Sequence, residues 1–176
     1  MFTIERLGAA ELTHHHADLA ALLINVVEGG SSVGFIAPLS EETADAFWGK
    51  IGAEVDAGKR LVLAAIEGDS DNQHIVGCVH LALAAPLNGT HRAEVQKLLV
   101  HSLHRQKGIA TALMTAIEDA ARGLGKSLLV LDTESGSTAD GLYERWGFVR
   151  SGVIPQYAQN STGTALIDTV IYYKLV

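Results

Sequence analysis

Residues 100–110 read V-H-S-L-H-R-Q-K-G-I-A and carry the clearest structural signal in the chain. The apolar run before them predicts a strand, and from Gly108 onward apolar residues recur at helical spacing. The small residues Gly108 and Ala110 let successive backbone N–H groups approach a bound anion, and a helix N-terminus favours negative charge. Arg105 and Lys107 add positive charge beside those donors. The segment therefore predicts a pyrophosphate cradle; the alternative is a glycine-tightened turn with two solvated basic residues.

A second signal follows in residues 139–148, which read A-D-G-L-Y-E-R-W-G-F. This pattern predicts a short helix over 137–146, a stop at Gly147 and a strand that begins at Phe148. Neither a Walker loop nor a G-x-G-x-x-G dinucleotide fingerprint is present in the sequence. A nucleotide site of either of those two kinds is therefore not predicted.

Hydrophobic periodicity and turn residues divide the rest of the chain into strands and helices. Ser40 has the character of a helix N-cap, and Asn88-Gly89 marks a turn between two strand candidates. The expected order is strand, two helices, three strands, helix, strand, helix, two strands, which is typical of a mixed α/β or α+β sheet. The expected strands cover about 2–7, 61–67, 75–85, 92–100, 127–131, 148–155 and 164–175, and the expected helices about 12–27, 40–57, 109–123 and 137–146.

Length and composition favour one compact domain over residues 1–176, with enough apolar residues for a core. The 13 basic and 20 acidic residues give a net charge of −7, which argues against a general nucleic-acid or acidic-membrane binder. Cys78 is the only cysteine, so no intrachain disulfide forms and a reducing cytoplasm is expected. No signal peptide or membrane-spanning run is expected. Adjacent histidines on a helix diverge, so His14-His15-His16 predicts no metal site.

Together the two signals resemble the GNAT acyltransferase superfamily, whose patterns are Q/R-x-x-G-x-G/A after a strand and then A-x-x-L-Y-x-x-x-G-F. The resemblance implies a central, mixed, mostly antiparallel twisted sheet of about seven strands flanked by about four helices. It also implies acetyl-CoA as cosubstrate, with no metal, and direct attack of an acceptor amine on the thioester. Segments S-V-G-F at 32–35, P-L-N-G at 86–89, R-A-E-V-Q-K-L at 92–98 and L-D-T-E-S-G-S at 131–137 resemble the tabtoxin-resistance group within that superfamily.

The resemblance assigns the donor site residue by residue. The strand before the cradle is expected to diverge from its neighbour and free backbone groups for the pantetheine arm, with an N–H near Val100 polarising the thioester carbonyl. Tyr143 matches the tyrosine that protonates the departing thiolate, and its alternative role is a core aromatic. The expected acetyl-CoA-binding residues are Leu98, Leu99, Val100, Arg105, Gln106, Lys107, Gly108, Ile109, Ala110, Thr111, Ser137 and Tyr143.

Two carboxylates are candidates for handling the acceptor's proton. Asp132 ends an apolar strand, and it either accepts that proton or caps the turn before Thr133. Glu94 lies in an otherwise apolar strand, and it either acts as a base or pairs with Arg92 or Lys97. The catalytic set expected from these arguments is Tyr143, Asp132 and Glu94.

The acceptor is expected to be a small-molecule amine held by loops from distant segments. A tabtoxinine-β-lactam-type toxin is the sharpest form of this hypothesis. The alternatives are another metabolite amine or a protein N-terminus, or a non-catalytic acyl-CoA sensor. A homodimer is expected from the resemblance. The expected acceptor-binding residues are Val33, Gly34, Phe35, Asn88, Asp132 and Tyr157.

Overall fold

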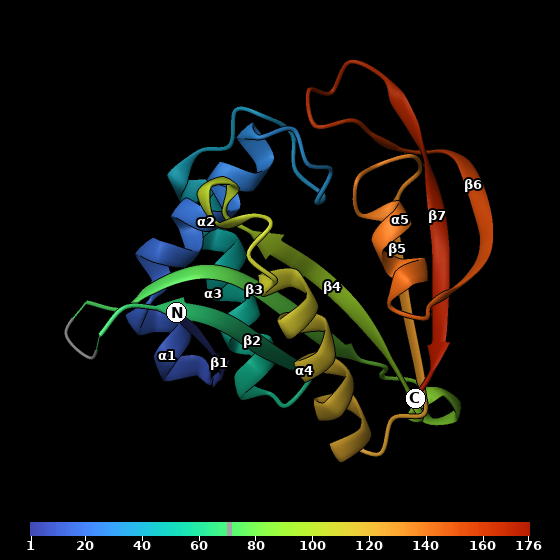
Figure 1. Ribbon diagram of the computed structural model, residues 1–176, viewed down its shortest axis with the longest axis horizontal. Coiled ribbons are helices and arrows are strands. Elements are labelled where there is room, and N and C mark those ends of the chain that lie inside the picture. The colour runs from blue at the N-terminus through green and yellow to red at the C-terminus, as the bar shows by residue number, and fades with distance from the viewer. Residues whose placement is uncertain (70–71) are drawn as a thin grey trace.

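The computed structural model describes residues 1–69 and 72–176 and contains a seven-stranded sheet (Figure 1). The strand order is β1-β2-β3-β4-β5-β7-β6. All neighbouring strands are antiparallel except β4 and β5, which run parallel at the centre of the sheet. The strands are β1 (Phe2–Leu7), β2 (Arg60–Glu67), β3 (His74–Leu83), β4 (Arg92–Val100), β5 (Leu128–Glu134), β6 (Val149–Gln159) and β7 (Leu166–Leu175).

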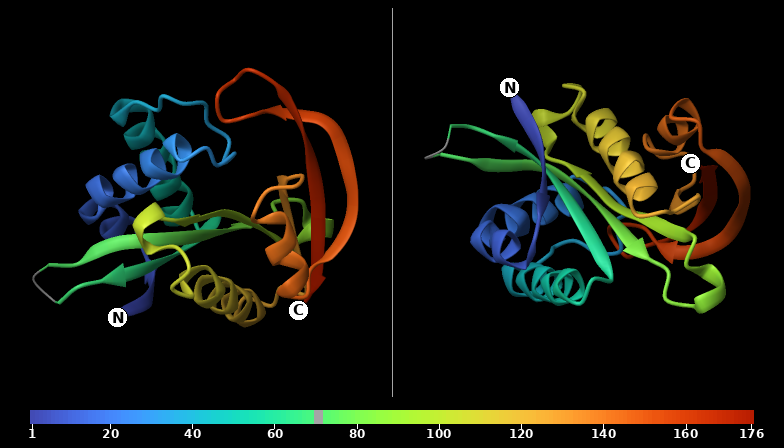
Figure 2. Two further views of the ribbon diagram at one scale, coloured as in Figure 1. Left: turned by 45° about the horizontal axis from the view of Figure 1, so that its top comes forward. Right: turned by 90° about the horizontal axis from the view of Figure 1, so that it is seen from below.

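Helices cover both faces of the sheet (Figures 1 and 2). The helices α1 (Ala9–His14), α2 (His16–Glu28) and α3 (Glu41–Asp56) pack on one face, where Leu23 and Trp48 join the buried cluster. The helices α4 (Ile109–Gly123) and α5 (Asp140–Arg145) pack on the other face, where Leu113 and Tyr143 belong to a second cluster. The sheet is therefore buried on both faces at its centre, as a mixed α/β architecture requires.

The β4–β5 ladder is short, and this positions the candidate site. Only the pairs Arg92–Leu128, Ala93–Leu129 and Glu94–Val130 join the two strands in the described part of the chain. Beyond Glu94, β4 stays paired with β3 but contains a bulge, at which Lys97 adopts a positive φ of 51°. A bulge bends and twists its strand. The second half of β4 therefore departs from β5, and the centre of the sheet opens there (Figure 1).

Most expected elements are confirmed, and the differences have local causes. The helix expected over 12–27 is interrupted at His15, so five helices are present in the described residues rather than four. Leu12 of α1 and Leu19 of α2, on either side of this break, are both buried. The helix expected over 137–146 covers only Asp140–Arg145, because the backbone N–H of Asp140 donates to Ser137 Oγ and the residues before it form a turn.

Other expected features can be compared directly. Ser40 caps α3, since its Oγ accepts a hydrogen bond from the Thr43 N–H. The strand expected over 127–131 continues to Glu134. The turn expected over 68–72 includes residues 70 and 71, which lie outside the described residues. No helix among the described residues is long and apolar enough to cross a membrane.

Candidate active site

The turn between β4 and α4 forms an open nest of backbone donors. Gln106 and Gly108 have positive φ angles of 62° and 81°, and Gly108 is the N-cap of α4. The first helical bond runs from the Ala112 N–H to the Gly108 carbonyl. Within the described residues, the N–H groups of 106–111 have no hydrogen-bond acceptor. Such a nest at a helix N-terminus binds anions, and exposed Arg105 and Lys107 flank it.

Contacts with α2 and β2 hold the short 3₁₀ turn over Ser102–His104, which leads into this nest. Asn25 on α2 accepts from the Ser102 N–H at 2.9 Å and donates to Ser102 Oγ at 3.1 Å. His104 Nδ1 lies 3.2 Å from Glu67 Oε2 at the end of β2. The Arg105 guanidinium reaches back to the Val100 carbonyl, with Nε 3.5 Å from the oxygen. The nest is therefore anchored by segments far from it in the sequence.

The end of β4 borders the opening in the sheet. In the part of the chain that the structure describes, Leu98, Leu99 and Val100 have no partner on β5, while Leu99 and Val100 remain paired with β3. Leu99 is fully buried, whereas Leu98 and Val100 are partly exposed. The structure thus brings the end of β4 and the backbone nest together in one continuous stretch of chain.

Tyr143 lies on α5 and packs among Trp146, Phe148 and Tyr172. Its side chain is buried, and its hydroxyl forms no hydrogen bond with any described residue. Burial, together with the nearby carboxylate of Asp132, raises the pKa of Tyr143 to about 12. The phenol therefore keeps its proton at neutral pH and remains able to donate it.

Asp132 lies inside β5, opposite Ile171 of β7, and does not cap a turn. The turn-capping alternative was wrong because β5 continues to Glu134, and the turn after it is capped by Asp140, which accepts from the Gly136 N–H at 2.8 Å. Along β5, Leu129 and Leu131 belong to the core beneath α4 and α5, so Val130 and Asp132 point to the opposite face. Loss of hydration and the charge of Glu94 raise the pKa of Asp132.

Glu94 and Asp132 share one face of the sheet. Glu94 is opposite Val130 in the ladder, and Asp132 follows Val130 by two residues. The ion pairs expected as alternatives, with Arg92 or Lys97, do not form in the described structure. Instead, Glu94 accepts from Gln96 Nε2 at 2.7 Å. The network continues through Arg60, which donates from Nη1 to Gln96 Oε1 at 2.8 Å and from Nε to Glu54 Oε2 at 2.6 Å.

Lys97 extends from the bulge of β4 to the loop that carries Val33, Gly34 and Phe35. Its ammonium donates to the Val33 carbonyl at 2.6 Å. The rings of Phe35 and Phe47 lie 5.7 and 5.8 Å from the same nitrogen. A Cβ at Gly34 would lie only 3.3 Å from it. Burial lowers the pKa of Lys97, and the charge of Asp132 acts in the opposite direction.

The remaining expected acceptor residues are not all gathered there. Tyr157 is 55% exposed on β6, beside a bulge at which Gln156 has a positive φ. Asn88 lies in a short 3₁₀ turn, Leu87–Gly89, before the start of β4, whereas Lys97, which contacts the 33–35 loop, lies in the second half of that strand. Ser137 lies before α5, with its Oγ 3.5 Å from Thr133 Oγ1.

Two side chains of β3, the strand that pairs with the Lys97 strand, are fully buried: Cys78 and His80. Cys78 is fully buried, and burial raises the pKa of its thiol far above the usual range. His80 is also fully buried, and neither ring nitrogen has a hydrogen-bond partner in the described residues. The His80 ring stacks on Phe47 and packs edge-on against Trp48. Burial lowers the pKa of His80 well below its usual value, so this imidazole is neutral.

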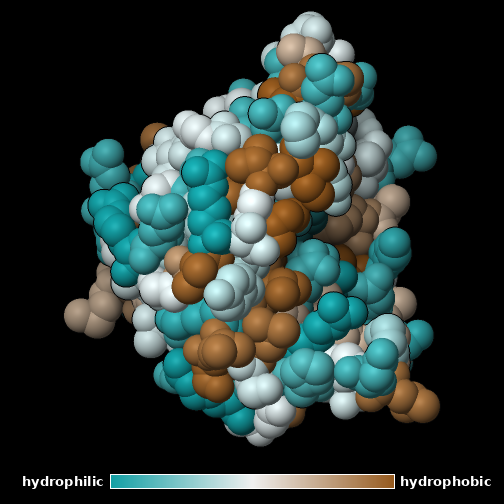
Figure 3. All heavy atoms as spheres, turned by 90° about the vertical axis from the view of Figure 1, so that its right-hand side faces the viewer, coloured by the Kyte–Doolittle hydropathy of each residue, from teal (hydrophilic) through white to brown (hydrophobic). Residues whose placement is uncertain are grey.

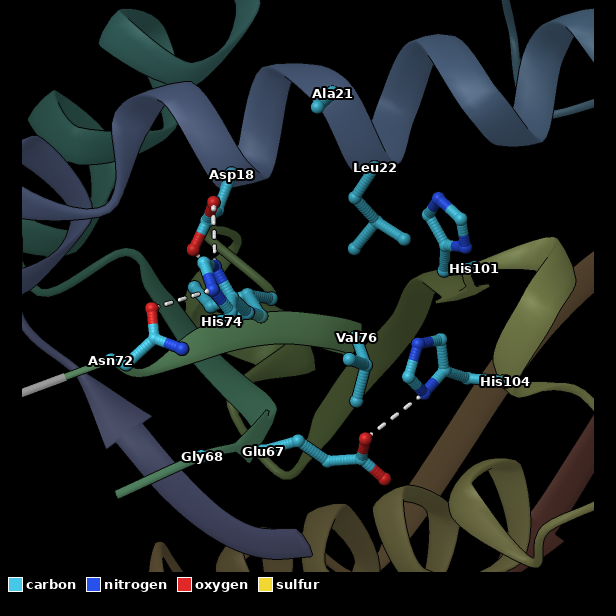
Figure 4. Close-up of a pocket in the computed structure, with 11 residues that line it drawn as sticks. Asp18, Ala21, Leu22, Glu67, Gly68, Asn72, His74, Val76, His101 and His104 are labelled. Carbon is cyan, nitrogen blue, oxygen red and sulfur yellow. Dashed lines mark hydrogen bonds and ion pairs between the residues drawn. The ribbon is translucent and has the colours of Figure 1, made fainter. Parts of the chain in front are cut away.

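A separate cavity of about 410 Å³ is lined by residues of α2, β2, β3 and the turn before the nest (Figure 4). His101 and His104 lie at one end of it with Glu67 of β2 beside His104, and Asp18 of α2 and His74 lie at the other end. Its polar side chains pair with one another, since His74 lies 3.6 Å from Asp18 and His104 lies 3.2 Å from Glu67. No cluster of His, Cys, Asp or Glu suited to a metal occurs in residues 1–69 or 72–176.

Sequence reasoning identified the nest, Asp132, Glu94 and Tyr143 as candidates but missed their supports. Asn25 and Arg60 gave no local signal, because each acts on a residue distant in the chain. A signal for Lys97 was present, since a lysine in an apolar strand is unusual, but its contact with Val33 depends on the bulge.

Comparison with known proteins finds a matching family model and similar solved folds. Residues 14–148 match the model of the acetyltransferase (GNAT) family. An N-acetyltransferase from Staphylococcus aureus is similar in structure, with a TM-score of 0.77 and 15% identity over 99% of this chain and 98% of that one. A proposed acetyltransferase from Salmonella typhimurium, solved with its cofactor acetyl-CoA, has a TM-score of 0.76 and 18% identity over 99% and 94%. A ribosomal-protein-alanine N-acetyltransferase from Brucella melitensis has a TM-score of 0.73 and 21% identity over 99% of both chains.

Proposed function

Because the chain belongs to the GNAT family of acetyltransferases, we propose that it transfers the acetyl group of acetyl-CoA to the amine of a small molecule. One observation carries the proposal. The sheet opens between β4 and β5 directly before a nest of free backbone N–H groups, with Asp132 and Tyr143 on opposite faces of that opening. A donor on one face can thus meet an acceptor on the other.

The donor would be held by its phosphates and its pantetheine arm. Residues 105–111 supply backbone donors and two basic side chains for the pyrophosphate. Leu98, Leu99 and Val100 border the opening and would supply backbone groups for the arm. An N–H near Val100 would polarise the thioester carbonyl, as an oxyanion-hole donor does.

The reaction needs two proton transfers besides the new C–N bond. The acceptor nitrogen attacks the thioester carbon, the C–S bond breaks, and the CoA thiolate departs. Asp132, assisted by the field of Glu94, accepts the proton from the amine. Tyr143 gives its proton to the thiolate, and the two protein groups then re-equilibrate with solvent. No covalent enzyme intermediate is required.

The experiment is release of CoA thiol from acetyl-CoA in the presence of amino acids, polyamines, aminoglycosides, an N-terminal peptide and tabtoxinine-β-lactam. We expect release with at least one amine, and KM for acetyl-CoA should rise about tenfold or more when Arg105 and Lys107 are both replaced by alanine. Release with the toxin alone would support the resistance role. Binding of acetyl-CoA without transfer to any acceptor would contradict the proposal and favour a sensor.

The proposal includes a homodimer in the cytoplasm. β6 is an edge strand, and apolar side chains gather on the face that it forms with β7 (Figure 3). A second copy would cover this exposed edge, and light scattering of the purified protein tests the dimer. A free buried thiol at Cys78 is compatible with a reducing compartment. The exposed apolar residues of the two strands are Val149, Val153, Ile154, Tyr157, Leu166, Tyr173 and Leu175.

A further inference from the structure

We propose that Lys97 recognises a carboxylate on the acceptor, so that the preferred acceptor carries both an amine and a carboxylate. This inference rests on the acetyl transfer proposed above and goes beyond it by defining the acceptor's chemical class. It also gives a specificity role to a residue that takes no part in the proton transfers.

The first argument is the incomplete pairing of the Lys97 ammonium. An ammonium has three N–H donors, and one of them is used by the Val33 carbonyl at 2.6 Å. No carboxylate among the described residues forms an ion pair with it. Its side chain is partly buried between the rings of Phe35 and Phe47. A partly desolvated charge with free donors is suited to an anionic oxygen from a ligand.

The second argument is the position of opposite charges near this ammonium. Glu94 and Asp132 lie on the same face of the sheet, and the charges of both act on Lys97. Gln96 holds one Glu94 oxygen, at 2.7 Å, and so fixes the orientation of that carboxylate. The two carboxylates suit the cationic amine of an entering acceptor, while Lys97 suits an anionic group of the same molecule.

The third argument is the loop that surrounds the ammonium. Gly34 has a positive φ of 86°, and any side chain there would lie against Lys97 Nζ. The loop backbone can therefore approach the charge closely, and Phe35 can cover one side of it. The loop and the two aromatic rings therefore enclose the ammonium on several sides.

The experiment compares amino acids with their carboxamides as acceptors. An amide of the same amino acid keeps the amine and side chain but has no carboxylate. Its amine is the weaker base, so more of it is neutral, and a preference for the acid cannot come from amine reactivity. For the wild type we expect kcat/KM to be about tenfold to a hundredfold higher for the acid than for the amide. In Lys97→Met we expect this ratio to fall to within about threefold of unity.

Control variants test whether Lys97 recognises the acceptor's carboxylate or only supports the loop over residues 33–35. Lys50→Met removes an equal charge from an exposed site on α3 and should leave the ratio unchanged. If Lys97 only supports the loop, Lys97→Met will lower activity on acid and amide equally, which would overturn the inference. A wild type that prefers the amide would also overturn it.

A binding measurement keeps the two proposals distinguishable. Calorimetric titration of the amino acid and its carboxamide, in the presence of CoA, reports recognition without turnover. Selective binding of the acid by the wild type and its loss in Lys97→Met would support the inference even if no acetyl transfer were found. Absence of transfer would then contradict the proposed function alone, whereas failure of the wild type to bind the acid more tightly would refute the role of Lys97.

Discussion

Asn25 and Ser102 are joined by two hydrogen bonds across 77 positions of sequence. The Asn25 amide accepts from the Ser102 N–H and donates to its hydroxyl, so α2 is fixed to the turn that precedes the nest. The position of the nest relative to β4 therefore depends on a helix from the other face of the sheet.

Replacing Asn25 by leucine should weaken acetyl-CoA binding about threefold to tenfold, because the turn loses both hydrogen bonds and the nest is less well held. Isothermal titration with CoA measures this. Ser102→Ala removes only the bond to the hydroxyl and should have a smaller effect. An unchanged affinity in Asn25→Leu would show that the nest does not need this anchor.

Replacing Tyr143 by phenylalanine should reduce kcat by about a hundredfold or more, because the thiolate then departs without a positioned acid. The ring contacts with Trp146, Phe148 and Tyr172 persist, so stability and CoA affinity should change little. Steady-state kinetics with calorimetric CoA binding test the split. Equal losses in kcat and CoA affinity would favour a core role.

The acid limb of the pH profile should report Asp132. The carboxylate must be ionised to accept a proton, so activity falls as pH decreases through a pKa that lies above the usual aspartate value. Glu94→Gln removes one cause of that rise and should move the limb to lower pH. Asp132→Asn should remove the limb and lower kcat/KM for the acceptor about a hundredfold or more. A limb that is unchanged in Asp132→Asn would assign it elsewhere.

Folding stability should fall in acid because of His80. In the unfolded chain this histidine titrates near its usual pKa of about 6.5, whereas burial lowers the pKa in the folded state. Below about pH 6.5 the unfolded state binds the extra proton, which destabilises the fold by up to about 1.4 kcal/mol per pH unit. Urea unfolding across pH measures the slope. The decrease of the unfolding free energy in acid should be smaller in His80→Leu, whereas replacing the exposed His91 by leucine should leave it unchanged.

Local sequence patterns predicted most of the fold because helices, strands and caps depend on nearby residues. The strand over 92–100 and the Ser40 cap follow from apolar patterning and side-chain chemistry alone. The break at His15 was missed because no proline or glycine stands near it in the sequence to indicate a helix end.

The candidate site was predictable only where its chemistry is local. Glycine and basic residues indicate the nest directly, but the surroundings of Lys97 arise from a bulge, a loop and α3 together. The His80 ring, which has no hydrogen-bond partner among the described residues, likewise packs against Phe47 and Trp48, which are distant in sequence. Local motifs and hydrophobic periodicity do not show which distant residues come into contact.

Three residue pairs between 92–94 and 128–130 are the whole β4–β5 ladder in the described chain. One half of the sheet carries Lys97 and leads into the nest, and the other carries Asp132. A donor and an acceptor that contact both halves would supply contacts between β4 and β5 beyond Glu94, where the described strands are not paired. The bound substrates would then connect the two halves of the sheet. In the free protein the sheet would be most flexible between the ends of β4 and β5, where the ternary complex holds the reacting groups in place.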